Sequence, residues 1–184
     1  SNNGYLKYEG PTDPTYTGSL GNVFGYKGFH LNIFMTYSFG NVVRLDPVFS
    51  AQYNDLSSMT KEFKNRYRLG GDENYTNVPT ILTYRQYHDN TQLQLGYNAY
   101  NYSDIRVAKG DFIRMKEISL SYDFPAAWFT HTALKNLSLK LQGTDLFLIY
   151  ADKKLNGQDP EFFRAGGVSA PLPRQFTLTV KAGF

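Results

Sequence analysis

The feature that most constrains this chain is a strict two-residue alternation of apolar and polar side chains. It is clearest in residues 29–41. The odd positions there are Phe29, Leu31, Ile33, Met35, Tyr37 and Phe39, and the even positions are His30, Asn32, Phe34, Thr36, Ser38 and Gly40. Because successive side chains of a β-strand point to opposite faces, this period predicts a strand with one apolar face and one largely polar face.

The same period recurs in four other segments, so we predict an all-β fold. The five predicted strands lie near residues 17–27, 29–41, 111–124, 137–148 and 174–184. The last of them ends on an alternating apolar series of Phe176, Leu178, Val180, Ala182 and Phe184. We expect the five strands to form an antiparallel meander.

The connections between the predicted strands alternate between short and long. A short turn near residues 26–28 and another connection at 125–134 contrast with the long segments 42–110 and 149–173. Outer-membrane β-barrels have this asymmetry, with short periplasmic turns and long outer loops. The pattern therefore favours about five strands of a large transmembrane barrel, in which 42–110 and 149–173 are outer loops.

The two faces of the strands permit a second interpretation. The polar face is rich in Ser, Thr, Asn and Gln and carries few charges, which suits lipid on one side and a wet lumen on the other. A half-buried antiparallel sheet in a soluble protein alternates in the same way. A soluble β-sandwich that binds carbohydrate or mediates adhesion is therefore the alternative.

The predicted strand at 111–124 departs from the simple pattern. Arg114 and Lys116 have the same phase as the apolar residues Ile118 and Leu120. In a barrel, either this half of the strand lies at the level of the lipid headgroups, or a β-bulge moves the two charges to the other face. The sequence leaves both explanations open.

Composition excludes several classes of function. The chain has no Cys, which excludes disulfides, thiol catalysis and Cys-ligated zinc. Its net charge is only +3, without a run of basic residues, so we expect no nucleic-acid partner. The three His residues are scattered, and the carboxylate pairs Asp72–Glu73 and Asp159–Glu161 are only local. We therefore predict no enzymatic activity, no cofactor and no metal site. Residues 152–159 lack the alternating oxygen ligands of a calcium loop, and Asn156-Gly157 predicts a turn.

Several stretches together resemble a known family. They are GSLGNVFGYKGFHLNIFMTYSFGN (18–41), NRYRLGGDENYTNVP (65–79), SDIRVAKGDFIRMKEISLSYDFP (103–125), LSLKLQGTDLFLIYADKKLNGQDPE (137–161) and PLPRQFTLTVKAGF (171–184). In order and spacing they resemble the C-terminal barrel section of SusC/RagA-like TonB-dependent outer-membrane transporters.

The resemblance implies a location and a set of partners. The parent would have an N-terminal plug, which is absent here, and a barrel of about 22 strands. It would import an oligosaccharide or oligopeptide across the bacterial outer membrane. This chain would supply barrel wall and extracellular loops. The implied partners are a SusD-like surface lipoprotein, TonB through the missing plug, the rest of the barrel and membrane lipid.

Two sets of residues are candidates for function. In the Tyr- and Asn-rich loop 42–110, we expect Tyr67, Asp72, Glu73, Tyr84 and Tyr97 to contact substrate or the lid lipoprotein. The alternative is that these side chains pack the loop against itself or form an aromatic girdle. In the last strand, the resemblance implies a signal for barrel assembly, with the residues Phe176, Leu178, Val180 and Phe184.

Overall fold

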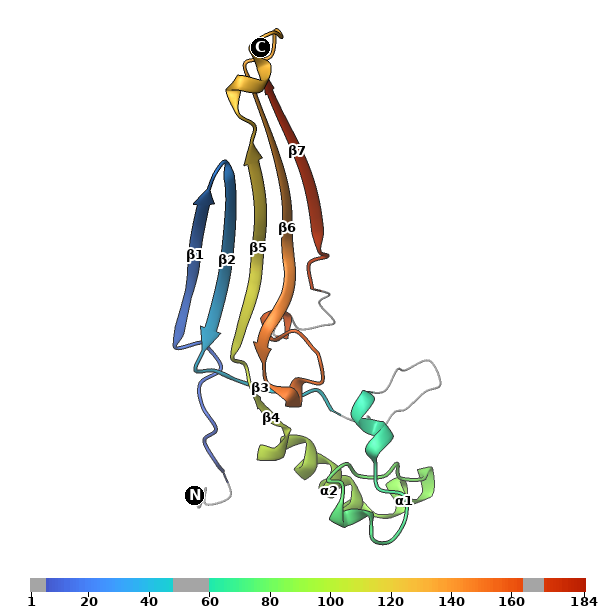
Figure 1. The fold of residues 1–184 in the computed structure, drawn as a ribbon. Coiled ribbons are helices and arrows are strands. Elements are labelled where there is room, and N and C mark those ends of the chain that lie inside the picture. Colours follow the sequence, from blue (N-terminus) through green and yellow to red (C-terminus); the bar gives the residue numbers. More distant parts are fainter. Residues whose placement is uncertain (1–5, 48–59, 164–170) are drawn as a thin grey trace.

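The computed structural model describes residues 6–47, 60–163 and 171–184, and its main element is a five-stranded antiparallel sheet. The strands lie side by side in chain order, so the prediction of an all-β antiparallel meander is confirmed (Figure 1). They are β1 (Tyr16–Tyr26), β2 (Phe29–Phe39), β5 (Phe112–Asp123), β6 (Asn136–Ala151) and β7 (Gln175–Gly183).

The connections at the two ends of the sheet differ in size. At one end lie the β1–β2 turn, the 3-10 helix η4 (Ala126–Phe129) and the carboxyl terminus (Figure 1). At the β1–β2 turn Lys27 and Gly28 both have positive φ, as tight two-residue hairpin turns require. The opposite end carries the long insertion between β2 and β5, together with the segment that follows β6.

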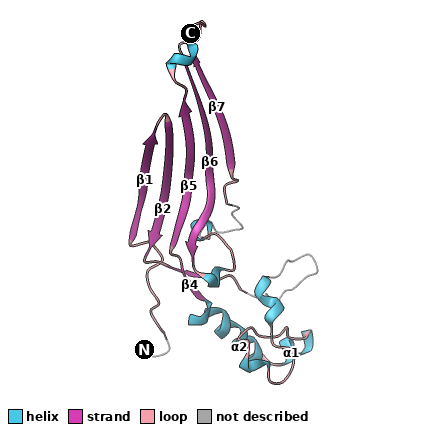
Figure 2. Cartoon of the chain, viewed as in Figure 1, coloured by secondary structure: helices cyan, strands magenta, loops and turns pink. Residues whose placement is uncertain are grey.

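The insertion contains regular structure that the sequence analysis did not predict (Figure 2). A short ribbon of β3 (Val42–Arg44) and β4 (Val107–Lys109) closes its base. Between these strands lie the 3-10 helices η1 (Lys61–Asn65), η2 (Asp72–Asn74) and η3 (Asp104–Arg106), and the α-helices α1 (Tyr84–Asp89) and α2 (Thr91–Tyr102).

Capping residues mark where both α-helices begin. Thr83 and Gln86 form a reciprocal capping box at the start of α1, and the side chain of Asn90 accepts from two backbone amides at the start of α2. These signals are visible in the sequence, but α2 has no buried side chain and only a weak amphipathic pattern.

A β-bulge interrupts β5 and explains why the charged residue Arg114 has the sequence phase of apolar residues. Met35 of β2 pairs with Met115, whereas Ile33 pairs with Ile118, so three residue steps on β5 match two on β2. The extra residue in this stretch is Lys116. Of the two explanations that the sequence left open, the structure contains the bulge.

The bulge changes which face Arg114 occupies. Arg114 pairs with Thr36 and so shares the polar face of the sheet, while Ile118 and Leu120 pair with Ile33 and Leu31 on the apolar face. One inserted residue therefore places Arg114 on the opposite face of the sheet from Ile118 and Leu120.

Several large side chains on the apolar face of the sheet are exposed, whereas two Ser residues on the polar face are buried. On the apolar face, Phe24, Leu141 and Leu178 are more than half exposed. On the polar face, Ser38 and Ser119 are almost completely buried. In a water-soluble domain the apolar face would be the covered one.

A small apolar core lies at the base of the insertion rather than on the sheet. Val43, Leu45, Ala108 and Leu155 are all under a tenth exposed and pack together. Leu155 belongs to the 3-10 helix η5 (Lys153–Leu155), which follows β6. This core joins the β3–β4 ribbon to the segment after β6.

Candidate functional site

A pocket in the insertion brings together three of the five predicted substrate- or lid-contacting residues. Tyr67, Glu73 and Tyr97 line a cavity of about 400 Å³ between residues 67–82 and α2. Most of the remaining lining is apolar and includes Val78, Pro79, Leu82 and Leu93. The volume lies in the usual range for small-molecule and side-chain pockets.

Tyr97 forms part of the inner wall of this pocket and is only partly exposed. Burial raises the pKa of the Tyr97 hydroxyl from 10.0 to about 12, and the neighbouring Tyr100 acts in the same direction. The Tyr97 hydroxyl therefore stays protonated at all physiological pH values and can donate or accept a hydrogen bond.

Glu73 stands at the rim of the pocket with an exposed side chain. Its Oε2 accepts a hydrogen bond of 2.8 Å from the backbone amide of Gly71. No Lys or Arg in the described ranges forms an ion pair with Glu73. The carboxylate thus adds an uncompensated negative charge to a pocket whose other lining residues are uncharged.

The other two predicted loop residues do not line this pocket. Asp72 Oδ2 accepts hydrogen bonds from the backbone amides of Arg68 (2.9 Å) and Leu69 (3.0 Å). Both bonds lower the pKa of the Asp72 carboxyl, and the bond from Leu69 has the larger effect. Tyr84 is four-fifths exposed and lies against the ring of His88, with 4.4 Å between the ring centres.

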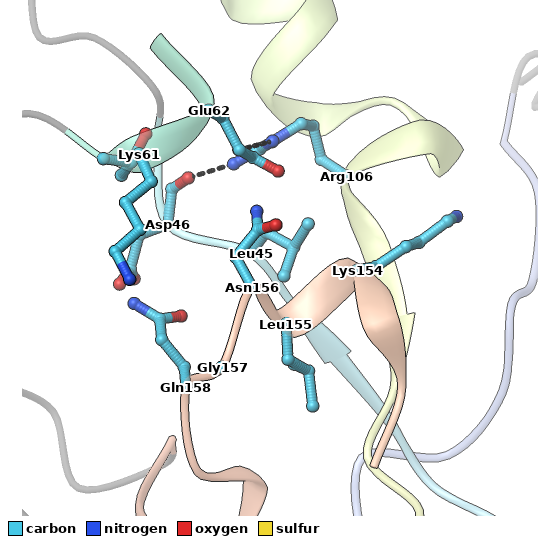
Figure 3. A pocket seen from close by; sticks show the side chains of 11 residues that line it. Leu45, Asp46, Lys61, Glu62, Arg106, Lys154, Leu155, Asn156, Gly157 and Gln158 are labelled. Atoms are coloured by element: carbon cyan, nitrogen blue, oxygen red, sulfur yellow. Dashed lines mark hydrogen bonds and ion pairs between the residues drawn. The ribbon is translucent and has the colours of Figure 1, made fainter. Parts of the chain in front are cut away.

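A second cavity, of about 230 Å³, lies where the insertion meets the segment after β6 (Figure 3). Arg106 is buried in its wall, where Nη1 lies 2.6 Å from Glu62 Oε2 and Nη2 donates to the carbonyl of Asp46. The guanidinium group also lies over the Tyr100 ring, 5.5 Å from its centre. Because its partners already neutralise it, Arg106 mainly holds the insertion together.

A cluster of charges attaches the segment after β6 to the polar face of the sheet. Arg114 Nη2 contacts Asp159, and Arg114 Nε lies 2.9 Å from Glu161 Oε2 in an ion pair that is not aligned as a hydrogen bond. The side chains of Arg114 and Asp159 are both under a tenth exposed. The bulge residue Lys116 extends the cluster to Asp145 (3.1 Å) and to Glu161 (3.5 Å).

This charge cluster is not apparent from the sequence. There, Asp159 and Glu161 form only a local pair, and Arg114 is only an exception to the alternation. The one available signal was that exception, because a charge in the middle of a strand needs a partner. The partner lies 45 residues further along the chain, and no local pattern identifies it.

The remaining sequence predictions concern turns and metals. Asn156 and Gly157 both have positive φ, as the predicted Asn-Gly turn requires. Asp152 caps η5 by accepting from the amide of Lys154 and also accepts from the amide of Lys109. In the part of the chain that the structure describes, no group of three or more His, Asp or Glu is placed to hold a metal ion.

The predicted assembly-signal residues lie on the exposed apolar face of the last strand. Phe176, Leu178 and Val180 are all at least three-fifths exposed, as is Phe184 just beyond the end of β7. Phe176 lies opposite Gly143 of β6, where a Cβ would be 3.3 Å from the Phe176 ring. Nothing in the described residues covers this row of side chains.

The fold of this chain is similar to part of the solved structures of the RagAB peptide importer. The chain aligns over 97% of its length with a chain of the RagAB peptide importer in the "open-open" state, with a TM-score of 0.64 and 19% identity. Its fold resembles part of a RagAB chain. A second RagAB peptide transporter structure gives the same values, and the "closed-closed" state gives a TM-score of 0.62.

The similarity to RagAB concerns only a portion of that protein. The aligned region spans 18% of the RagAB chain. No protein-family model and no curated protein matches the sequence. None of the helices in the described ranges has the length and apolarity that a membrane crossing needs.

Proposed function

We propose that this chain forms part of the wall and the outer loops of a bacterial outer-membrane barrel that imports an oligosaccharide or oligopeptide. The observation that carries this proposal is the exposed row of large apolar side chains on one face of the sheet. Leu141 and Leu178 are exposed on one face, whereas Ser119 is buried and Arg114 is ion-paired on the other. A lipid environment would stabilise such a sheet, because lipid tails cover the apolar face.

The fold similarity to the RagAB peptide importer supports a role in transport. In this proposal residues 42–110 and 149–173 lie outside the cell, and the turn at 125–134 lies in the periplasm. A SusD-like surface lipoprotein would cover the outer loops, and TonB would act through a plug domain in the complete protein. The chain itself would perform no covalent chemistry and would need no cofactor.

The soluble β-sandwich accounts less well for the same sheet. A sandwich requires a second sheet packed face to face on the apolar side strands. Among the described residues the second sheet is the three-residue β3–β4 ribbon, which lies beyond one end of the large sheet (Figure 1). It is too small to cover the apolar face.

Single cysteines test the membrane assignment directly, because the sequence contains none. Leu141 pairs with Leu178 on the apolar face, and Gln142 pairs with Thr177 on the polar face. Each residue would be replaced by Cys in the full-length protein in native outer membranes and labelled with an environment-sensitive fluorophore. We expect blue-shifted emission, quenched by lipid-borne quenchers, at Leu141→Cys and Leu178→Cys only.

The neighbouring positions serve as matched controls. Labels at Gln142→Cys and Thr177→Cys should emit as in water and respond to a soluble quencher. Equal emission from both faces, or recovery of the protein only in the soluble fraction, would contradict the proposal.

A further inference from the structure

The pocket between residues 67–82 and α2 has an inner wall and a rim of different chemistry. The inner wall is apolar or aromatic, with partly buried Tyr67, Val78, Pro79 and Tyr97. The rim carries the exposed carboxylate of Glu73. A ligand that fits both parts has an apolar group to bury and a positive charge that remains near solvent.

The position of Glu73 at the rim indicates which kind of positively charged group the pocket can bind. A Lys or Arg side chain would carry its charge at the far end of an aliphatic stem, so an apolar pocket would need the carboxylate at its bottom. Glu73 is instead at the exposed rim. The first residue of a peptide fits this arrangement. Its apolar side chain can enter the pocket while its α-ammonium group stays at the mouth, near Glu73.

The pocket is poorly suited to a sugar. Sugar hydroxyls lose hydrogen bonds to water on binding, and a site that binds them must replace those bonds with several polar groups. Here the lining is mostly apolar, and the amide side chains Asn77 and Gln92 are both exposed. Tyr67 and Tyr97 line the pocket together with Val78 and Pro79.

We infer that this pocket binds the free amino terminus of an oligopeptide whose first residue has a large apolar side chain. The inference rests on the proposed function, and it selects the peptide from the two substrate classes named there. The α-amino group of a peptide has a pKa near 8, so it is charged at neutral pH and is attracted to Glu73. The cavity of about 400 Å³ accommodates one such residue.

Two synthetic tetrapeptides test the inference with the full-length protein in detergent or nanodiscs. The first is Leu-Ala-Ala-Ala with a free amino terminus, and the second is the same peptide N-acetylated. Calorimetry should show about fivefold tighter binding of the free peptide, the effect of one exposed ion pair. In Glu73→Gln this preference should disappear, whereas Asp89→Asn, an exposed carboxylate on α1 outside the pocket, should retain it.

Gly96 allows the pocket to be filled without disturbing the fold. It lies in α2 at the pocket rim, and a Cβ at this position would meet no atom within 4 Å. Gly96→Phe should therefore fold normally and weaken binding of the free peptide at least about tenfold, because the apolar side chain loses its site. Asn98→Phe introduces the same side chain at an exposed position of α2 outside the pocket lining and should leave peptide binding unchanged.

The possible results separate this inference from the proposed function. Equal binding of the two peptides, unaltered binding by Gly96→Phe, or binding of maltoheptaose blocked by Gly96→Phe would overturn the peptide pocket even if the cysteine labels place the sheet in lipid. Loss of the lipid signature would overturn the barrel, whatever the peptide data show.

Discussion

At the scale of single residues, neighbours in the sequence have different tasks. Asp72 and Glu73 are adjacent and were predicted as equivalent contacts. Asp72 binds the backbone amides of Arg68 and Leu69, whereas Glu73 lines the pocket. Asp72 therefore shapes the turn that presents Glu73, and its effect on a ligand is indirect.

The first prediction concerns the acid sensitivity of this turn. The amides of Leu69 and Arg68 hold the pKa of the Asp72 carboxyl below its ordinary value of 3.8, so Asp72 stabilises the folded turn above about pH 4. This stabilisation should be lost as the pH falls through the lower folded pKa. Hydrogen exchange should show reduced protection of both amides in acid, and Asp72→Ala should show the same reduction at neutral pH.

The control for this prediction is Asp89→Ala, which removes an exposed carboxylate that pairs with Arg85 on α1. It should leave the protection of Arg68 and Leu69 unchanged. Full protection of both amides in Asp72→Ala would show that the carboxylate does not maintain the turn.

At the scale of elements, the bulge in β5 and the segment after β6 depend on each other. The bulge moves Arg114 to the polar face, where Asp159 and Glu161 reach it from the 3-10 helix η6 (Pro160–Phe162) and its cap. Burial of a charge is tolerated only when partners neutralise it. The ion pairs therefore determine where this segment lies against the wall.

The second prediction is that Arg114→Gln releases this segment. Removal of one partner of a buried ion pair costs about 3–5 kcal/mol, and here the carboxylate of Asp159 would stay buried without its counter-charge. Cleavage by a lysine-specific protease after Lys153 or Lys154 should become at least about tenfold faster. A protease of this specificity is suitable because the substitution leaves its cleavage sites unchanged.

Two further variants make the Arg114 prediction specific. Arg85→Gln removes an exposed i,i+4 pair and should not alter cleavage. Adding Asp159→Asn and Glu161→Gln to Arg114→Gln should restore part of the resistance, since no buried charge is then left unpaired. Unchanged cleavage of the Arg114→Gln protein would mean that the ion pairs do not hold the segment.

At the scale of the whole molecule, the sheet has two open edges. The outer edges of β1 and β7 pair with no other strand in the described part of the chain. Unpaired edges and an exposed apolar face both favour association with another surface. In the proposed barrel, neighbouring strands would complete both edges, and β7 would form the seam with the first strand.

The third prediction tests whether the end of β7 directs barrel assembly. Phe184 is about four-fifths exposed and continues the apolar row of β7. Phe184→Asp in the full-length protein should lower the amount in the outer membrane, measured by fractionation, while total synthesis stays constant. Phe184→Tyr keeps the aromatic ring and should assemble normally, and wild-type membrane levels of the Asp variant would refute the assembly role.

The sequence by itself determined the strands and their faces. A two-residue period is a local property, because side-chain direction alternates along any strand, so it indicated the strands and the apolar row from Phe176 to Phe184. The β1–β2 turn also depends on adjacent residues alone, so the sequence indicated it. The sequence also showed that Arg114 has the phase of the apolar residues, but it did not show the bulge that explains this.

Only the tertiary structure decided between the two explanations for Arg114 and brought distant residues together. It placed the bulge at Lys116, because register depends on the neighbouring strand. It also brought Arg114 to Asp159, and Tyr67 to Tyr97, across long stretches of chain. Such contacts depend on the path of the intervening loops, which no local period encodes.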